Sequence, residues 1–463
     1  MNHSENSREQ RAESREQGTG NTDSDSPLPA PCSPLPAPDS PLPARQGMSL
    51  TQDAWRRLRR NRVAMLSLAT LVVICLLAFI TPLLPLQAPD FTQTSLQYAE
   101  PIATPLWLHT FKLDTELIAK TPGAVEKLHV QLPGLEASLA EADAALDRAA
   151  AALAADLTQE ERKQALAAEQ AAYDDAWFAL RQKQAEIQDT IQQPYRKLGF
   201  SQLGGLSQWL VQVRFALFGD LSLNSICGRD LLGRDLFSRL FWGARISLIV
   251  GLVATIVSLV IGVTYGAVAG YFGGWIDDAM MRFVDVLYSV PFIFVVIFLL
   301  TILGQENVAD KLAYYGIDRI AVFYLVVGAI YWLTMSRVVR GQVISLKHEL
   351  FVESARSLGA GQMRIIFLHL LPNLFSVVIV YLTLTSPRVM LFEAFLSFLG
   401  LGVEPPDVSW GLLANEGIKV ITPVKIYWWL ILFPSLALGM TLLALNFLGD
   451  GLRDALDPRL RDV

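Results

Sequence analysis

The chain has 463 residues, of which 52% are hydrophobic and 18% are charged, and its mean hydropathy is positive. A soluble globular protein carries about 25% charged residues, so this composition excludes that class and predicts a membrane protein. Three distant cysteines and five scattered histidines form neither a disulfide framework nor a metal-ligand spacing, so no metal or cofactor is expected. No Gly-x-x-x-x-Gly-Lys-Ser/Thr phosphate loop occurs, so we assign no catalytic residues. Any ATP that drives this protein must be hydrolysed by another chain.

The chain begins with a predicted tail and a membrane anchor. Residues 1–47 repeat Ser-Pro-Leu-Pro-Ala three times, and such a segment buries too little apolar surface to fold, so a disordered tail is expected. Residues 48–86 place five arginines before about 20 apolar residues, which predicts a first transmembrane helix from Val63 to Leu84. The positive-inside rule puts its arginine-rich end in the cytoplasm. Beside a membrane span these arginines indicate contact with lipid rather than with nucleic acid.

Residues 87–224 are soluble in character and are expected outside the cytoplasm. They carry 18 acidic against 11 basic residues between Ala88 and Asn224. Apolar residues recur every seven positions in two runs, and a Thr-x-x-Glu capping box at Thr158 begins the second run. This pattern predicts an antiparallel helical hairpin over about residues 134–193. A partner-binding role and a passive spacer are both compatible with it.

Residues 225–245 are predicted to form an interfacial amphipathic helix. Five apolar side chains can share one helical face there, and Arg234, Arg239 and Arg245 are offset from that face. We therefore expect these arginines to reach towards lipid headgroups.

Residues 246–463 contain five further apolar segments, which predicts six transmembrane helices in an all-α polytopic membrane protein. Glycines in the first of these segments allow close helix approach. Asp285 is expected to pair with Arg282 at helical spacing. Six spans would place both chain termini in the cytoplasm. The five segments cover about residues 246–272, 283–303, 320–335, 374–393 and 427–448.

Residues 340–372, called the coupling loop below, lie between the fourth and fifth of the six predicted spans. Arginines and lysines around the loop predict a cytoplasmic position. Gly359 and Gly361 break a short first helix, and a second apolar segment is expected to end at Pro372. A helix, a glycine turn and a helix form a compact docking element, although an ordinary connector between spans has the same pattern. The expected apolar stripe of the first helix is Phe351, Val352, Ala355 and Leu358.

The coupling loop resembles the EAA loop in the membrane subunits of bacterial ABC importers. His369 stands where the general pattern has isoleucine, and the ending Arg-Ile-Ile-x-x-His-x-Leu-Pro-Asn looks like the dipeptide and oligopeptide branch. Residues 228–239, with Arg229 in place of a threonine, and residues 396–411 also resemble that branch. The residues at the family's spacing are Glu353, Ser354 (in place of a small alanine), Ala355, Gly359, Leu371 and Pro372.

The resemblance implies a C-type permease subunit of a dipeptide, oligopeptide or nickel-type importer in the bacterial inner membrane. It also implies four kinds of partner: a homologous second permease, two ABC ATPase subunits, an extracytoplasmic solute-binding protein and membrane lipid. The subunit would form half of a translocation pathway that works by alternating access. Two alternatives stay open at this point. One is a non-peptide solute such as a nickel complex, or an antimicrobial peptide, and the other is a secondary carrier, which would need carboxylates deep in the spans.

Arg388 is the candidate pathway residue. It lies about 14 residues into the fifth predicted span, or roughly 21 Å, which is past the midplane of a hydrocarbon core about 30 Å thick. Thr383, Thr385 and Ser386 make the neighbouring stretch polar, so we expect all four residues to line the pathway. Snorkelling of Arg388 to the outer surface, or its pairing with Glu393, is the alternative.

Overall fold

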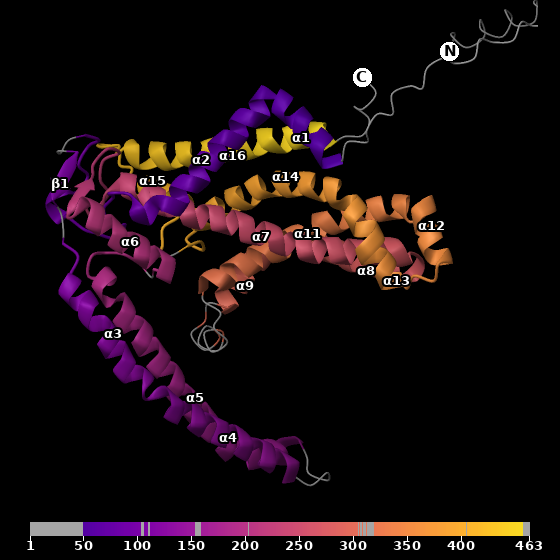
Figure 1. Cartoon of the computed structure of the whole chain (residues 1–463), viewed down its shortest axis with the longest axis horizontal. Coiled ribbons are helices and arrows are strands. Elements are labelled where there is room, and N and C mark those ends of the chain that lie inside the picture. The colour runs from indigo at the N-terminus through magenta and orange to yellow at the C-terminus, as the bar shows by residue number, and fades with distance from the viewer. Residues whose placement is uncertain are drawn as a thin grey trace, which may run out of the picture. The chain divides into compact units, whose positions relative to one another are not determined.

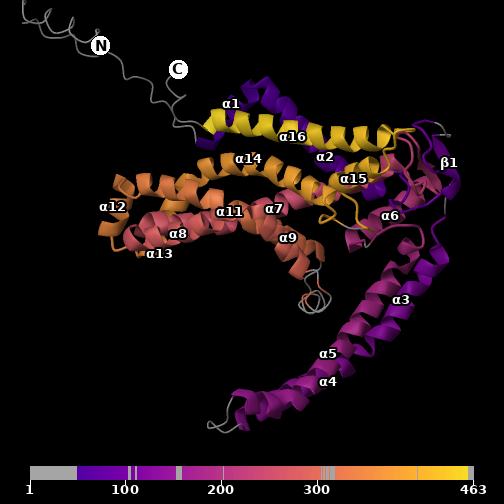
Figure 2. The same ribbon diagram turned by 180° about the vertical axis from the view of Figure 1, so that it is seen from behind.

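The computed structural model describes residues 50–102, 106–109, 112–152, 159–201, 203–303, 305, 308, 312, 319–403 and 405–456. The tail predicted over residues 1–47 lies outside them. The described part of the chain is almost entirely helical (Figures 1 and 2), which confirms the all-α fold class.

Four helical stretches are long and apolar enough to cross a membrane, and two bent pairs raise the total to six if each pair is one span. The polytopic class is therefore confirmed for the described residues, and the count of six stays a prediction. The four stretches are α2 (Arg62–Ile80) with η2 (Thr81–Leu83), α7 (Leu236–Phe272), α14 (Leu371–Phe398) with the turns before it, and α16 (Trp429–Leu456). The bent pairs are α8 (Gly274–Ser289) with α9 (Phe292–Leu303), at 85°, and the two halves of α11 (Arg319–Leu346), at 42°.

Helix α7 packs closely along α11, as its glycines predicted. A Cβ atom on Gly266 would lie 2.3 Å from the carbonyl oxygen of Ser336, and one on Gly262 would lie 2.6 Å from Cβ of Met335. Only hydrogen fits at these positions, so the two backbones can approach each other directly.

Different apolar clusters cover the two ends of α7. Near its last residues, Ala267 packs with the end of α11, the coupling loop and the start of α14. Near its first residues, Leu236 and Ala244 pack with α15 (Trp410–Lys419) and α16. Figure 1 follows α7 between these two groups of elements, with α12 at one end and α15 at the other.

Residues 87–224 contain more structure than the predicted hairpin. Helix α5 (Gln159–Arg196) packs along α4 (Leu132–Ala152) and also contacts α3 (Thr115–His129); the pair α4 and α5 lies side by side in Figures 1 and 2. The capping-box residue Thr158 lies outside the described residues. The sequence did not predict α3, α6 (Gly205–Phe218), or the antiparallel strands β1 (Trp107–His109) and β2 (Leu221–Leu223), in which Leu108 pairs with Ser222.

The C-terminal end of α5 is anchored to the rest of the chain. The Gln192 amide donates to the Leu203 carbonyl at 2.7 Å and accepts from the Leu203 N–H at 3.0 Å. Tyr195 is buried beside Leu203, and Trp242 of α7 closes the same cluster. The remaining elements are α1 (Leu50–Arg60), η3 (Thr94–Leu96), α12 (Leu350–Ser357), α13 (Gln362–Arg364) and the π-helical turn η4 (Ile365–Leu370).

Candidate coupling loop, pathway residues and arginine block

Helix α12 of the coupling loop is held by two side chains. Val352 and Ala355 are buried against the ends of α7, α11 and α14. The other two residues of the predicted stripe differ, since Phe351 is partly exposed and Leu358 is 89% exposed. The predicted four-residue apolar stripe is therefore wrong at both of its ends, and the exposed leucine faces away from this chain.

A glycine ends α12, as the sequence predicted. Gly359 has φ +81°, a left-handed conformation that costs other residues free energy. Its N–H donates to the Arg356 carbonyl, and the Ala360 N–H donates to the Ala355 carbonyl, both at 3.0 Å. This is the Schellman pattern, which satisfies the last free carbonyls of a helix.

The second half of the coupling loop differs from the prediction at Pro372. Residues from Gln362 onward run through η4 into α14 as one continuous helical stretch, so Pro372 does not end a segment. It lies just after the π-helical turn η4, where the regular i→i−4 hydrogen-bond ladder is already interrupted. Leu371 beside it is half-buried.

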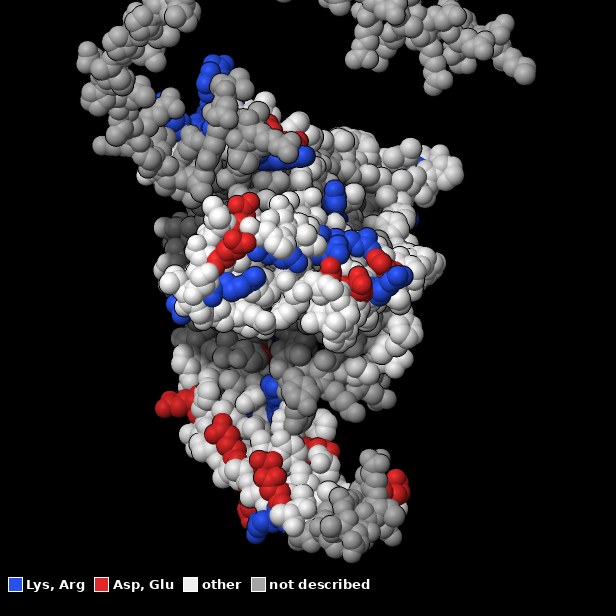
Figure 3. Space-filling view, turned by 90° about the vertical axis from the view of Figure 1, so that its right-hand side faces the viewer, with Lys and Arg blue, Asp and Glu red and all other residues white. Residues whose placement is uncertain are grey.

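Glu353 and Ser354 lie on the exposed side of α12. The Ser354 hydroxyl donates to the Leu350 carbonyl at 2.8 Å, and the Glu353 carboxylate supplies negative charge on this side of α12. Figure 3 looks at this end of the molecule and shows Lys and Arg side chains in a band across it. Arg356 and Arg364 of the coupling loop are also exposed. The surface is therefore mixed in charge and open to solvent.

Two ion pairs join α8 to α11 just before the coupling loop. Arg340 binds Asp277 through two hydrogen bonds of 2.5 and 2.6 Å, and the Asp277 side chain is buried. Asp285 binds Arg337 at 2.6 Å, in a pair that is exposed on both sides. The predicted Arg282–Asp285 pair is wrong, because α11 brings a better-placed guanidinium to that carboxylate. The sequence showed all of these charges, but no pattern tells which helix faces α8.

The four predicted pathway residues do not converge. Thr383 faces α16, where a Cβ on Gly449 would lie 3.1 Å from its hydroxyl. Ser386 faces α7, with its hydroxyl 3.1 Å from that of Thr255. Thr385 is half-buried and donates to the Tyr381 carbonyl at 2.6 Å. At about 100° per residue, Thr383 and Ser386 lie on one face of α14, and Thr385 and Arg388 lie on another.

Arg388 is exposed on the surface of α14, and its backbone carbonyl accepts from the Tyr331 hydroxyl at 3.2 Å. The alternative pairing with Glu393 is wrong. Glu393 is buried and accepts 2.8 Å hydrogen bonds from the hydroxyls of Ser397 and Ser409. Glu393 thereby ties α14 to the residue that caps α15, a role that sequence spacing could not indicate.

Residues 224–239, called the arginine block below, form a buried ion network instead of an interfacial helix. Arg239 is 1% exposed and binds Asp230 at 2.7 Å and Glu416 of α15 at 2.5 Å. Arg234 binds the same Asp230 at 2.7 Å and also Asp90 at 3.2 Å. The prediction that Arg234 and Arg239 face lipid headgroups is wrong, because Asp230 of the same block and acids from two distant segments meet them inside the protein.

A second buried group completes the arginine block. Arg229 is fully buried and donates to the Asn224 side chain at 2.7 Å and to the Gly233 carbonyl at 2.6 Å. Asp235 caps α7, accepting from the N–H groups of Ser225 at 2.6 Å and Ser238 at 2.8 Å. Burial raises the pKa of Asp235 to about 6, although those N–H groups and Arg229 oppose the shift. The first turn of α7 is thus fixed by buried polar contacts.

Comparison with known proteins agrees with this architecture. Residues 262–462 match the family model described as binding-protein-dependent transport system inner membrane component, and residues 49–101 match the N-terminal TM domain of oligopeptide transport permease C. The chain is 40% identical over 315 residues to a dipeptide transport system permease protein of Bacillus subtilis, covering 62% of this chain and 94% of that protein. It is 45% identical over 234 residues to an oligopeptide transport system permease protein of Haemophilus influenzae (50% and 70%). It is 42% identical over 238 residues to a glutathione transport system permease protein of Pectobacterium atrosepticum (50% and 72%).

The fold and these matches define a multi-pass inner membrane protein of a transport system. The chain belongs to the family of binding-protein-dependent transport system inner membrane components, as an ABC importer permease of the dipeptide and oligopeptide branch. The resemblance inferred from the sequence is thereby confirmed, and the secondary carrier is set aside. Membership of this family implies that an ATPase and a substrate-binding protein work with the chain.

Proposed function

We propose that this chain is the C-type permease subunit of a peptide importer and forms half of its translocation pathway. The relatives described above are permeases for dipeptides, oligopeptides and glutathione, which share the peptide bond as their common chemistry. The observation that carries the proposal is α12, a short helix that is anchored on one side and exposed on the other. A helix of this kind is suited to dock into another subunit.

In this proposal α12 transmits force from an ATPase to the membrane helices. Val352 and Ala355 connect it to three helix ends, so a displacement of α12 must move those ends or break a well-packed cluster. Glu353 and Ser354 would face the ATPase, and Gly359 would set the angle at which the chain leaves it. The transmembrane helices would then switch between two openings, as alternating access requires.

The proposed assembly contains one homologous second permease, two ABC ATPase subunits and an extracytoplasmic solute-binding protein. Both termini of this chain would lie in the cytoplasm, on the same side as the coupling loop. Arg62 and the arginines before it support this orientation through the positive-inside rule.

A reconstituted importer tests the function. Proteoliposomes that contain the full chain, its second permease and the ATPases should take up labelled peptides when ATP and the binding protein are supplied. Glu353→Lys and Gly359→Trp should abolish uptake while the chain stays folded and inserted. Glu126→Lys on α3 is the matched control and should transport normally. Normal uptake in the Glu353 and Gly359 variants would contradict the coupling role, and uptake of some other solute but no peptide would contradict the substrate class.

Arg388 is proposed to line the pathway, because its exposed guanidinium lies on a membrane span and could attract a peptide carboxylate. Arg388→Gln should reduce uptake of peptides with a free carboxylate more than uptake of the same peptides amidated. Thr385→Val on the same helix serves as the control. Equal losses for both peptides would leave Arg388 a structural residue.

We also propose that α4 and α5 contact the solute-binding protein. A groove of about 760 Å³ runs between α3 and α5, and Trp177 and the exposed Phe178 line it. Replacing residues 130–180 by a short linker removes Trp177 and Phe178 together with α4, spares the Gln192 anchor, and should weaken uptake at low peptide concentration. Basal ATPase activity should not change. Unaltered uptake under those conditions would make the two helices a spacer.

A further inference from the structure

Helix α6 has an apolar face that nothing in the described chain covers. Leu206, Trp209 and Leu217 lie on one side of the helix and are all more than half exposed. The opposite side, with Val211 and Arg214, is buried against the rest of the chain. An amphipathic helix with a tryptophan on its free apolar side is typical of a helix that lies in the membrane interface.

A second uncovered apolar face runs down α7. Ile249, Leu252, Ile256 and Val260 are exposed at spacings of three and four residues, so they form one stripe along a membrane-spanning helix. Arg245 lies one turn before Ile249 on this same stripe. A basic side chain at the end of an apolar stripe is placed where lipid tails give way to headgroups.

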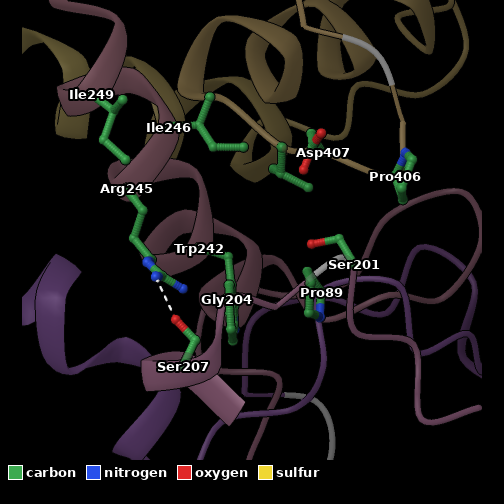
Figure 4. Close-up of a pocket in the computed structure, with 11 residues that line it drawn as sticks. Pro89, Ser201, Gly204, Ser207, Trp242, Arg245, Ile246, Ile249, Pro406 and Asp407 are labelled. Carbon is green, nitrogen blue, oxygen red and sulfur yellow. Dashed lines mark hydrogen bonds between the residues drawn. The ribbon is translucent and has the colours of Figure 1, made fainter. Parts of the chain in front are cut away.

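A pocket lies where α6 and α7 meet (Figure 4). Its volume is about 150 Å³, and its walls come from the start of α6, from α7 and from residues 406–408. The Arg245 guanidinium donates to the Ser207 hydroxyl at 2.9 Å and lies over the Trp242 ring, 5.1 Å from its centre. Among the described residues no carboxylate lies within 4.0 Å of it. Arg234 and Arg239 have acids inside the protein, whereas Arg245 is left to bind an anion from outside.

We propose that this pocket binds the phosphate of a phospholipid headgroup. Arg245 and Ser207 would hold the phosphate, and the lipid's acyl chains would lie along the α7 stripe, with α6 flat in the interface beside them. Asp407 lines the other side of the pocket in Figure 4. The rest of the headgroup, beyond the phosphate, would lie towards this side of the pocket.

Native mass spectrometry of the purified full chain tests this site. After delipidation, the protein is mixed with phosphatidylethanolamine or phosphatidylglycerol, and retained lipid is counted. Arg245→Gln keeps a partner for Ser207 but loses the charge, so retention of phosphatidylethanolamine should fall about tenfold. Arg337→Gln, at the other end of the molecule, is the matched control and should retain lipid normally.

Further arms separate a lipid from other occupants. Ile249→Asn, which alters the stripe and leaves Arg245 in place, should also weaken retention. Soluble phosphoethanolamine should compete poorly, because it has no acyl chain to cover the stripe. Three results would overturn the proposal: full retention by Arg245→Gln, equal competition by phosphoethanolamine, or loss of the lipid when the importer is assembled, which would make this face a subunit contact.

Discussion

The charged residues near the two ends of α7 differ in burial and in pairing. At the arginine block, Arg239 and Asp230 are buried and paired with each other, and Arg239 also pairs with the partly buried Glu416. At the coupling loop, Glu353 and Leu358 are exposed. A buried ion network is stable only when all of its charged partners are present in the folded chain. An exposed helix leaves its outer side chains free to contact a second protein. The N-terminal end of α7 is therefore stabilised within this chain, and the elements at its C-terminal end are suited to contact with a second protein.

Breaking the arginine block should have the largest effect on stability. Arg239→Met leaves the buried Asp230 and the partly buried Glu416 with Arg234 as their remaining cation, so the free energy of unfolding should still fall by about 3 kcal/mol. Thermal unfolding of the full chain in detergent measures this change. Arg337→Met, which breaks the exposed pair near the coupling loop, should cost less than about 1 kcal/mol. Similar losses for both variants would remove the contrast between the two ends.

Asp235 gives the same end of α7 a pH dependence. Its pKa of about 6 in the folded chain exceeds the ordinary value of 3.8, so the folded state binds this proton more tightly. The stabilisation is present below about pH 4 and is lost as the pH rises through 6, by about 3 kcal/mol in total. Asp235→Asn should remove this dependence. Hydrogen-exchange protection factors of residues 224–239, corrected for the faster intrinsic exchange at higher pH, measure it at pH 5 and pH 7, and greater protection at pH 7 than at pH 5 would contradict the assignment.

The two ion pairs between α8 and α11 allow a buried and an exposed ion pair to be compared within one pair of helices. Asp277→Asn should lower the free energy of unfolding by about 2 kcal/mol, because it weakens a buried, two-bonded partner of Arg340. Asp285→Asn should cost between about 0 and 1 kcal/mol. Exchanging the charges, with Asp277→Arg and Arg340→Asp together, should restore part of the loss. Equal losses in the free energy of unfolding for Asp277→Asn and Asp285→Asn would show that burial does not determine how much each ion pair stabilises the protein.

Leu358 should give the smallest effect on stability. Leu358→Ser changes an exposed side chain, so the free energy of unfolding should move by less than about 0.5 kcal/mol. ATP-driven uptake should nevertheless fall, because the proposed ATPase contact loses its apolar residue. Leu370→Ser, at a buried position of the same loop, should instead destabilise the chain by about 2–4 kcal/mol. A stability loss at Leu358 would mean that this end is also completed within the chain.

The sequence predicted most of the membrane architecture, because long apolar segments and flanking charges are local features. The glycine contacts of α7 and the turn at Gly359 were predicted for the same reason, since one residue type decides each. The bends in α11 and between α8 and α9 were missed, because an apolar segment looks the same whether it is straight or broken.

The arginine block shows why charge partners are harder to predict. Arg234 and Arg239 lie on a segment whose periodicity fits an interfacial helix, while their acids lie at Asp90, Asp230 and Glu416, more than 100 residues apart in two cases. Only the packing of α15 against the start of α7 brings them together. Arg245, a few residues further on, has no such carboxylate partner among the described residues. Of the three arginines, it is the one for which we propose the headgroup contact that the sequence predicted.

The length of α7 determines how far its two ends move when the helix tilts. The helix spans 37 residues without a proline, whereas α14 and α16 each have one in the helix interior. At 1.5 Å per residue it is a rod of about 55 Å. A tilt of roughly 10° about its middle would therefore carry each end through about 5 Å, the height of one helical turn. The arginine block fixes the N-terminal end of α7. A displacement of the C-terminal end must therefore either rotate the whole block with the helix or be opposed by the block's buried contacts.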